Sequence, residues 1–258
     1  MGSPDHKGPI TLLLLVVFSA NTYSQLQTDC GIDIVIAIDT SCSITDEDKN
    51  TTREFIIDLA RTINIGPGPT ESQLGVLTYN DGIQHQFYLN DAKTNDEAIK
   101  LAENINTTPL GCRTHTHTAL EVIRNDYFTA ANGDRPNAAN IGLVLTDGIT
   151  IPPRFGKNTI AQAQLTKDAG IEMYVVALPS ESKRDRDESE WRAIASDKVE
   201  DHFYNVESFT DLTSIITDLS VAVCEEKTTV QSNITTATTT EPMTTEPTTT
   251  EPTTVEPT

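Results

Sequence analysis

The stretch IDIVIAIDTSCS spans residues 32–43 and contains the pattern from which the fold follows. Its first part, Ile32–Ile38, is a largely apolar, β-branched run, which is typical of a strand buried on both faces. The run ends at Asp39, and the residues that follow, Thr40–Ser43, are small and rich in side-chain oxygens. Ligand sites of parallel sheets lie at the carboxyl ends of the strands, so this junction is a candidate site.

The chain from Cys30 to Cys224 continues by alternating strand and helix patterns. Asn80-Asp81-Gly82 predicts a hairpin turn between two strands. We therefore predict an α/β fold, a doubly wound and mostly parallel central sheet with one antiparallel edge strand and helices on both faces. The expected strands are residues 32–38, 73–79, 83–88, 139–146, 171–178 and 202–206, and the expected helices are residues 46–63, 97–105, 116–127, 160–169, 187–195 and 212–223.

Two further loops carry oxygen-rich residues at predicted strand or helix ends. Asp147 follows the strand at 139–146, and the sequence GCRTHT at residues 111–116 precedes a helix. Asp39, Ser41 and Ser43 alternate in the first loop and can therefore point toward one centre. Carboxylates combined with hydroxyls form a hard oxygen ligand set, which suits Mg²⁺ or Mn²⁺ and, less tightly, Ca²⁺.

In these loops the chain resembles the von Willebrand factor type A family, integrin inserted domains included, over about residues 33–223. Members of that family carry a metal-ion-dependent adhesion site, built from a DxSxS loop, a Thr in a second loop and an Asp in a third. The matching motifs here are DTSCS, GCRTHT and LTDG. The resemblance implies a domain at residues 31–224 and a metal site made by Asp39, Ser41, Ser43, Thr114 and Asp147.

The resemblance also implies adhesion without bond breaking. A divalent cation, Mg²⁺ before Mn²⁺ or Ca²⁺, would bind a Glu or Asp carboxylate of an extracellular matrix protein. Arg113, His115 and His117 surround Thr114 and are expected to form a partner-binding rim, in which Arg113 either orients the partner's acidic group or is a plain surface residue. The two histidines could instead ligate zinc, although the sequence offers no third ligand.

No motif supports catalysis. The sequence has no GxSxG elbow, no GxGxxG after a strand and no Walker phosphate loop. A phosphatase with an Asp nucleophile would need a second Asp where Ser41 stands. We therefore expect that the protein is not an enzyme.

The amino terminus predicts export. The apolar run Ile10–Ala20 is too short to span a bilayer and is followed by small polar residues, which indicates a signal peptide at residues 1–24, then a short segment at 25–30. No other stretch approaches the length of a membrane span, so we expect a secreted matrix protein without a membrane-inserted helix or a lipid anchor.

Four cysteines in an oxidising compartment predict disulfides. Cys30 precedes the first strand and Cys224 closes the last predicted helix, so pairing them would join the two ends of the domain. Cys42 and Cys112 then remain for each other, which would stiffen the metal site because they lie in two of its loops. Zinc is the alternative, but the chain has no CxxC spacing.

The carboxyl-terminal residues 225–258 are rich in Thr, Glu and Pro, with a repeat of the form TTEPT. Such a segment can bury almost nothing, so it is expected to be a disordered linker or an O-glycosylated stalk. N-glycosylation acceptor patterns occur at Asn50, Asn106 and Asn233.

The charge balance of 18 basic against 38 acidic residues leaves the chain at −20. A polyanion repels nucleic acid and acidic membranes, so neither is an expected partner. The alternative function is structural. The protein would then be a component of an extracellular organic matrix of the mineralised, shell type, and its acidic surface would bind Ca²⁺ or carbonate mineral. The chain has no long Asp or Glu run of the kind a dedicated mineral binder would show.

Overall fold

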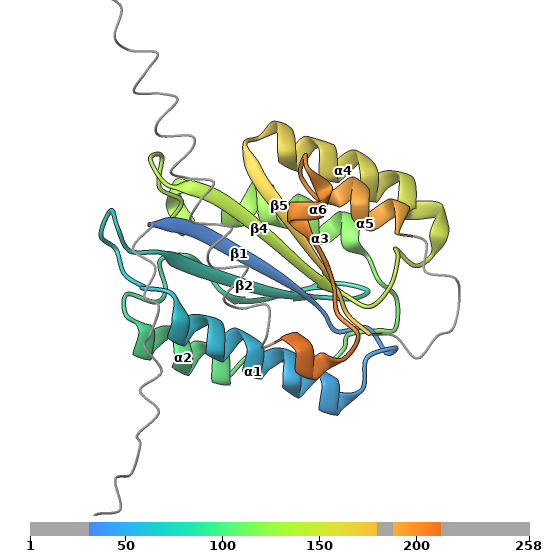
Figure 1. The fold of residues 1–258 in the computed structure, drawn as a ribbon, viewed down its shortest axis with the longest axis horizontal. Coiled ribbons are helices and arrows are strands. Elements are labelled where there is room, and N and C mark those ends of the chain that lie inside the picture. The colour runs from blue at the N-terminus through green and yellow to red at the C-terminus, as the bar shows by residue number, and fades with distance from the viewer. Residues whose placement is uncertain (1–30, 180–187, 213–258) are drawn as a thin grey trace, which may run out of the picture.

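The computed structural model describes residues 31–179 and 188–212, which are coloured along the chain in Figure 1. The expected signal peptide, the predicted last helix beyond Leu212 and the carboxyl-terminal tail fall outside the described residues, together with Cys30, Cys224 and Asn233.

A single six-stranded sheet in the order β3-β2-β1-β4-β5-β6 forms the centre of the described part. All neighbouring strands run parallel except β2 and β3, which form the antiparallel hairpin at one edge. This arrangement confirms the predicted fold class. The strands are β1 (Ile32–Asp39), β2 (Gln73–Tyr79), β3 (Ile83–Phe87), β4 (Ala139–Thr146), β5 (Ile171–Ala177) and β6 (Phe203–Asn205).

Helices cover both faces of the sheet, as Figure 1 shows, with α1 and α2 on one face and α3, α4 and α5 on the other. The alternation of β1 divides its buried side chains between the two cores. Ile34 and Ile36 pack with α1 and α2, while Val35 and Ala37 pack on the opposite face. The helices are α1 (Asp46–Thr62), α2 (Asn95–Glu103), α3 (Thr116–Val122), α4 (Gly156–Asp168), α5 (Ser189–Ile194) and α6 (Val199–His202).

Local interactions set the helix ends. Thr45 caps α1 by accepting from the Asp48 amide at 3.1 Å, and Thr94 caps α2 by accepting from the Glu97 amide at 3.2 Å. A short 3₁₀ turn, Pro153–Phe155, leads into α4, so this helix begins earlier than the apolar spacing predicts. Within residues 31–179 and 188–212, none of the helices has the length and apolar character needed to cross a membrane.

The predicted helix at 116–127 is α3 followed by a π-helical turn, Ile123–Tyr127. The wider turn coincides with Tyr127, whose hydroxyl donates to the Val76 carbonyl at 2.6 Å and whose ring lies against Gly75. A Cβ at Gly75 would come within 3.0 Å of that ring. The departure from regular α-helix therefore accompanies a specific contact with the sheet.

A buried ion pair anchors the amino ends of the strands. The Asp33 carboxylate is fully buried in β1 and accepts from the Arg135 amide and Nε, each at 2.8 Å. The same guanidinium donates to the carbonyls of Gly68 and Glu71, at 2.8 and 2.9 Å. Burial raises the pKa of Asp33, and the hydrogen bonds and charge of Arg135 offset only part of that rise. The contacts explain why an Asp interrupts an otherwise apolar strand.

Candidate metal centre

The carboxyl ends of two neighbouring strands bring the first and third loops together. β1 pairs with β4 in parallel register, so Asp39 at the end of one strand lies beside Thr146 at the end of the other. The Thr146 hydroxyl donates to Asp39 Oδ2 at 2.8 Å. Asp147 follows directly, so both acidic residues lie at the same edge of the sheet.

Four of the five residues expected to bind metal form one hydrogen-bonded series. The Ser41 amide donates to Asp39 Oδ1 at 2.8 Å, which fixes the first carboxylate. The hydroxyls of Ser41 and Ser43 are 3.0 Å apart, and the Ser43 hydroxyl donates to Asp147 Oδ1 at 3.0 Å. The first and third loops therefore present their oxygens to one another.

Thr114 is tied to both of these loops through its neighbours. Its amide donates to the Ile151 carbonyl at 3.3 Å, and the Ile151 amide donates back at 2.9 Å, which joins the second loop to the third. A disulfide between Cys42 and Cys112, with their Cα atoms 4.7 Å apart, joins the second loop to the first. This is the pairing that the sequence led us to expect for these two cysteines.

The electrostatics of the site favour a bound cation. Asp39 and Asp147 are both buried, 1% and 4% exposed. Burial, followed by the charge of Asp147, raises the pKa of Asp39 to about 7. Two acidic groups at one buried site repel each other when both are ionised, and a divalent cation between them would remove that repulsion.

The oxygen spacing fits a small hard cation. Around Mg²⁺, with ligands at about 2.0–2.1 Å in an octahedron, adjacent oxygens are about 3 Å apart. The Ser41–Ser43 and Ser43–Asp147 oxygen distances, each 3.0 Å, are hydrogen-bond distances and are also compatible with adjacent positions around such a cation. Among the described residues no group of three or more His, Cys, Asp or Glu side chains is placed to hold a metal. The candidate site is thus a hydroxyl-rich one.

Arg113 lies exposed beside Thr114. Its amide donates to Asp81 Oδ1 at 2.7 Å, which holds the second loop against the turn that follows β2. The backbone is therefore fixed while the residue remains exposed at the edge of the candidate site.

His115 and His117 lie half-buried at the start of α3, with ring centroids 5.5 Å apart. Both rings contact Phe155, at 5.7 and 5.1 Å, and the Arg154 guanidinium lies 4.9 Å from the centre of the same Phe155 ring. Burial, and then the neighbouring His115, lowers the pKa of His117. The sequence reasoning did not identify Phe155 or Arg154 as neighbours of this rim.

Two more polar residues that the sequence reasoning missed, Thr40 and Asn80, fix the first and second loops through buried hydrogen bonds. The Asn80 side-chain amide donates to the Thr40 hydroxyl at 2.9 Å, and the Asn80 carbonyl accepts from the His115 amide at 3.0 Å. Both side chains are fully buried. Their positions at the ends of β1 and β2 were the signal that could have revealed them.

The two acceptor asparagines within the described part are exposed: Asn50 in α1, and Asn106 in the segment after α2. Asn106 Oδ1 accepts from the Thr108 amide at 3.0 Å. Glycan attachment at Asn50, Asn106 and Asn233 stays a prediction.

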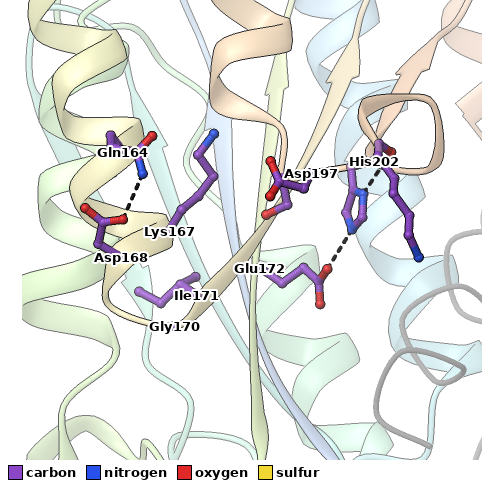
Figure 2. Close-up of a pocket in the computed structure, with 10 residues that line it drawn as sticks. Gln164, Lys167, Asp168, Gly170, Ile171, Glu172, Asp197 and His202 are labelled. Atoms are coloured by element: carbon purple, nitrogen blue, oxygen red, sulfur yellow. Dashed lines mark hydrogen bonds and ion pairs between the residues drawn. The ribbon is translucent and has the colours of Figure 1, made fainter. Parts of the chain in front are cut away.

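A separate cavity of about 490 Å³ lies at the opposite end of the sheet, where β5 begins (Figure 2). Three of its titratable side chains bind one another or the backbone. His202 Nε2 lies 2.7 Å from Glu172 Oε1, and Lys167 Nζ donates to the carbonyls of Ala193 and Ala195 at 2.8 and 3.0 Å. Acidic and basic groups are mixed along its wall, which gives no preference for a ligand of either charge.

The von Willebrand factor type A domain model matches residues 33–218, and the chain belongs to this family. The match confirms the resemblance predicted from the three loop motifs. The Collagen alpha-1(XII) chain of Notophthalmus viridescens is 32% identical over 197 residues, covering 76% of this chain and 20% of that one. Matrilin-1 of Mus musculus is 28% identical, covering 76% and 36%, and Integrin alpha-1 of Gallus gallus is 30% identical, covering 72% and 64%.

Solved structures of proximal thread matrix protein 1 from the mussel byssus share the fold. One has a TM-score of 0.66 and 24% identity, covering 77% of this chain and 48% of that chain. Another, at 23% identity and the same TM-score, has zinc in its MIDAS motif. The relatives are matrix and adhesion proteins, and the chain spans 20% and 36% of the first two of them.

Proposed function

We propose that this chain is a secreted adhesion protein that binds an extracellular matrix protein through a divalent cation. Asp39, Ser41, Ser43, Thr114 and Asp147 would hold the cation, and an acidic side chain of the partner would complete its coordination. The observation that carries the proposal is the series of hydroxyl and carboxylate oxygens at 3.0 Å spacing, which links the first and third loops. The matrix and adhesion proteins among the relatives support it.

The charge of the ligand set explains why an outside carboxylate would bind. Two carboxylates neutralise a divalent cation formally, and the hydroxyls of Ser41, Ser43 and Thr114 add no charge. Where Asp39 or Asp147 binds through water, the inner ligands are mostly neutral hydroxyls, and the cation remains a strong enough Lewis acid to attract a further anionic oxygen. The bound cation supplies the attraction, while the protein keeps Asp39 in place through the Ser41 amide and the Thr146 hydroxyl.

The rim would then select the partner. Arg113, His115 and His117 surround Thr114, and Arg113 is a positive group on a chain of net charge −20. A partner carboxylate near the cation would therefore meet a favourable local field. Mg²⁺ is the cation we expect, because carboxylate and hydroxyl oxygens are the hard ligands that it prefers.

The test is Asp147→Ala compared with Asp96→Ala, a control at an exposed position in the first turn of α2. Mg²⁺ should raise the unfolding temperature of the wild type and of Asp96→Ala, and should have no effect on Asp147→Ala. Wild-type protein should retain a partner from a matrix extract, and chelator or Asp147→Ala should abolish that retention. Equal Mg²⁺ protection of Asp147→Ala and the wild type would contradict the proposal.

The same variants distinguish the structural alternative, in which the acidic surface acts without a specific site. Under that alternative, adsorption to calcium carbonate would be unchanged in Asp147→Ala, because one carboxylate of 38 acidic residues alters the total charge little. Adsorption that persists while no extract protein binds through the cation would favour the mineralised-matrix function.

A further inference from the structure

Helix α5 reaches the third loop through a buried carboxylate. Glu190 is 7% exposed, and its Oε1 accepts from both the amide and the hydroxyl of Thr150, each at 2.7 Å. The Thr150 hydroxyl also lies 2.6 Å from the Thr159 hydroxyl of α4, and Thr159 is fully buried. Thr150 is thus held between two helices, three residues after Asp147.

The next residue of α5 holds the same loop at a second point. Trp191 is 1% exposed, and its indole Nε1 donates to the Gly148 carbonyl at 3.1 Å. The Gly148 amide donates to the Thr146 hydroxyl at 3.3 Å, and that hydroxyl donates to Asp39 Oδ2. The Thr146 hydroxyl also lies 2.9 Å from the Gly148 carbonyl, so Gly148 and Thr146 stand between the indole and the first carboxylate.

A third attachment lies immediately beyond. Ile151 exchanges two backbone hydrogen bonds with Thr114, at 3.3 and 2.9 Å. The segment 148–151 is therefore fixed at Gly148 and Thr150 by α5 and at Ile151 by the second loop. Asp147 and Thr114 lie on the two sides of this segment, so its position sets the distance between two of the expected metal ligands.

We propose that Glu190 and Trp191 are positioning residues for the cation site. The inference rests on the proposed function, because it concerns the same five ligands. The carboxylate and the indole lie beneath the loop and hold the segment that joins Asp147 to Thr114. A ligand displaced by a fraction of an ångström no longer fits the near-ideal octahedron that Mg²⁺ demands, so loss of these contacts weakens cation binding.

The contacts predict which substitutions matter. Glu190 acts as an acceptor in both bonds to Thr150, so Glu190→Gln keeps a carbonyl oxygen that can accept both. Glu190→Ala removes the acceptor and leaves the buried Thr150 amide without this partner. Trp191→Phe keeps an aromatic ring in the core but removes the indole donor to Gly148. Glu190→Gln removes the charge but keeps the acceptor, whereas Glu190→Ala removes both. The pair therefore distinguishes an effect of loop position from an effect of charge.

The experiment measures Mn²⁺ affinity by electron paramagnetic resonance on folded protein, well below the unfolding temperature, with competition by Mg²⁺. Glu190→Ala should weaken Mn²⁺ binding by roughly tenfold and Trp191→Phe by roughly threefold, on the scale of one lost buried hydrogen bond. Glu190→Gln should restore affinity to within about twofold of the wild type.

The matched control is Arg135→Gln, which removes the contacts of the Asp33 ion pair at the opposite end of the sheet. It should lower the unfolding temperature and leave Mn²⁺ affinity unchanged. If Glu190→Ala fails to fold, two milder variants make the same test: Trp191→Phe, and Thr150→Val, which removes one hydroxyl. Each should weaken Mn²⁺ binding by roughly threefold.

Wild-type Mn²⁺ affinity in the α5 variants would overturn the inference. So would equal weakening in Arg135→Gln, which would show a general effect of stability, or in Glu190→Gln, which would show an effect of charge. Failure of the proposed function gives a different result: the wild type binds no Mn²⁺, or Asp147→Ala binds it as tightly.

Discussion

Asp39 combines two properties that both disfavour its ionised form in the metal-free protein. It is buried at the end of β1, and it faces a second acidic residue, Asp147. Both burial and the neighbouring charge disfavour its ionised form, and together they raise its pKa from 3.8 to about 7. The folded protein without metal therefore retains a proton on Asp39 that the unfolded chain has already released at pH 5 to 6.

This placement predicts a pH-dependent stability that Asp39→Asn should remove. Because the folded pKa is the higher one, the contribution of Asp39 to stability is full below about pH 4 and is lost as the pH rises through 7. In chelator, Asp39→Asn should unfold at a higher temperature than the wild type at pH 8, and the difference should shrink at pH 5. At about 1.4 kcal/mol per pKa unit, the gap at pH 8 amounts to a few kcal/mol at most.

At pH 8, Mg²⁺ should raise the unfolding temperature of the wild type above that of Asp39→Asn. The cation binds the ionised carboxylate, so it should stabilise the wild type at pH 8 more than at pH 5 and should not protect Asp39→Asn. Thermal unfolding of both proteins at the two pH values, with Mg²⁺ and with chelator, makes the comparison. Parallel pH profiles in chelator would show that Asp39 titrates near its ordinary pKa.

At the scale of elements, a disulfide joins two of the three loops of the candidate site. Cys112 lies two residues before Thr114, and Cys42 lies between Ser41 and Ser43, so the disulfide joins the ligand-bearing backbone of two loops directly. Both cysteines are exposed, which places the bridge at the rim and not in the core. Its effect on the site is therefore to fix the position of Thr114 relative to the serines.

The double variant Cys42→Ser and Cys112→Ser should lower both stability and cation affinity. The bridge spans 70 residues of sequence, and the chain-entropy model gives about 4 kcal/mol for closing a loop of that size. Guanidinium denaturation in chelator measures the first effect, and Mn²⁺ titration of the folded variant measures the second. Unchanged Mn²⁺ affinity beside lowered stability would show that the bridge only stabilises the fold.

The sequence predicted some elements more accurately than others, for physical reasons. A strand buried on both faces is a continuous apolar run, so the ends of β1, β2, β4 and β5 agree with the prediction to within one residue. The four-residue helix α6 was not predicted, because so short a segment contains barely one turn from which to recognise a period. Its first residue follows Lys198, whose φ of 59° no local pattern indicates.

In the candidate site, too, some features could be predicted from the sequence and others could not. Its expected ligands adjoin strand or helix ends that apolar patterns reveal, so their loops could be located from the sequence. The contacts of α5 could not, because Glu190 and Trp191 lie 40 and 43 residues from the groups that they bind in the third loop. Trp191 is buried in the core, but a sequence pattern does not identify the acceptor of an indole N–H.

At the scale of the whole molecule, the net charge of −20 affects the proposed binding of an acidic partner. The net charge repels an acidic partner, but at physiological ionic strength this repulsion is largely screened at separations beyond about 8 Å. A cation in the candidate site would act inside that distance, together with the exposed Arg113. Attraction of an acidic group would therefore be confined to the one edge of the sheet where the three loops meet.

The two remaining cysteines predict how the ends of the domain are joined. With Cys42 and Cys112 paired, Cys30 and Cys224 are left of the four. Cys30 lies two residues before β1, and Cys224 lies six residues beyond the end of the family match at 218. A bridge between them would enclose nearly the whole domain, which is the loop length at which the chain-entropy model gives its largest stabilisation, about 5 kcal/mol.

Peptide mapping without reduction should therefore find Cys30 linked to Cys224. The double variant Cys30→Ser and Cys224→Ser should lose stability to denaturant, by about 3–5 kcal/mol, while its Mn²⁺ affinity stays that of the wild type. The contrast with the Cys42 and Cys112 variant follows from position, because Cys30 adjoins the start of β1, whereas the candidate site lies at the opposite end of that strand. A mapped link from Cys30 to Cys42, or weaker Mn²⁺ binding in this variant, would mean that the ends of the domain are not independent of the site.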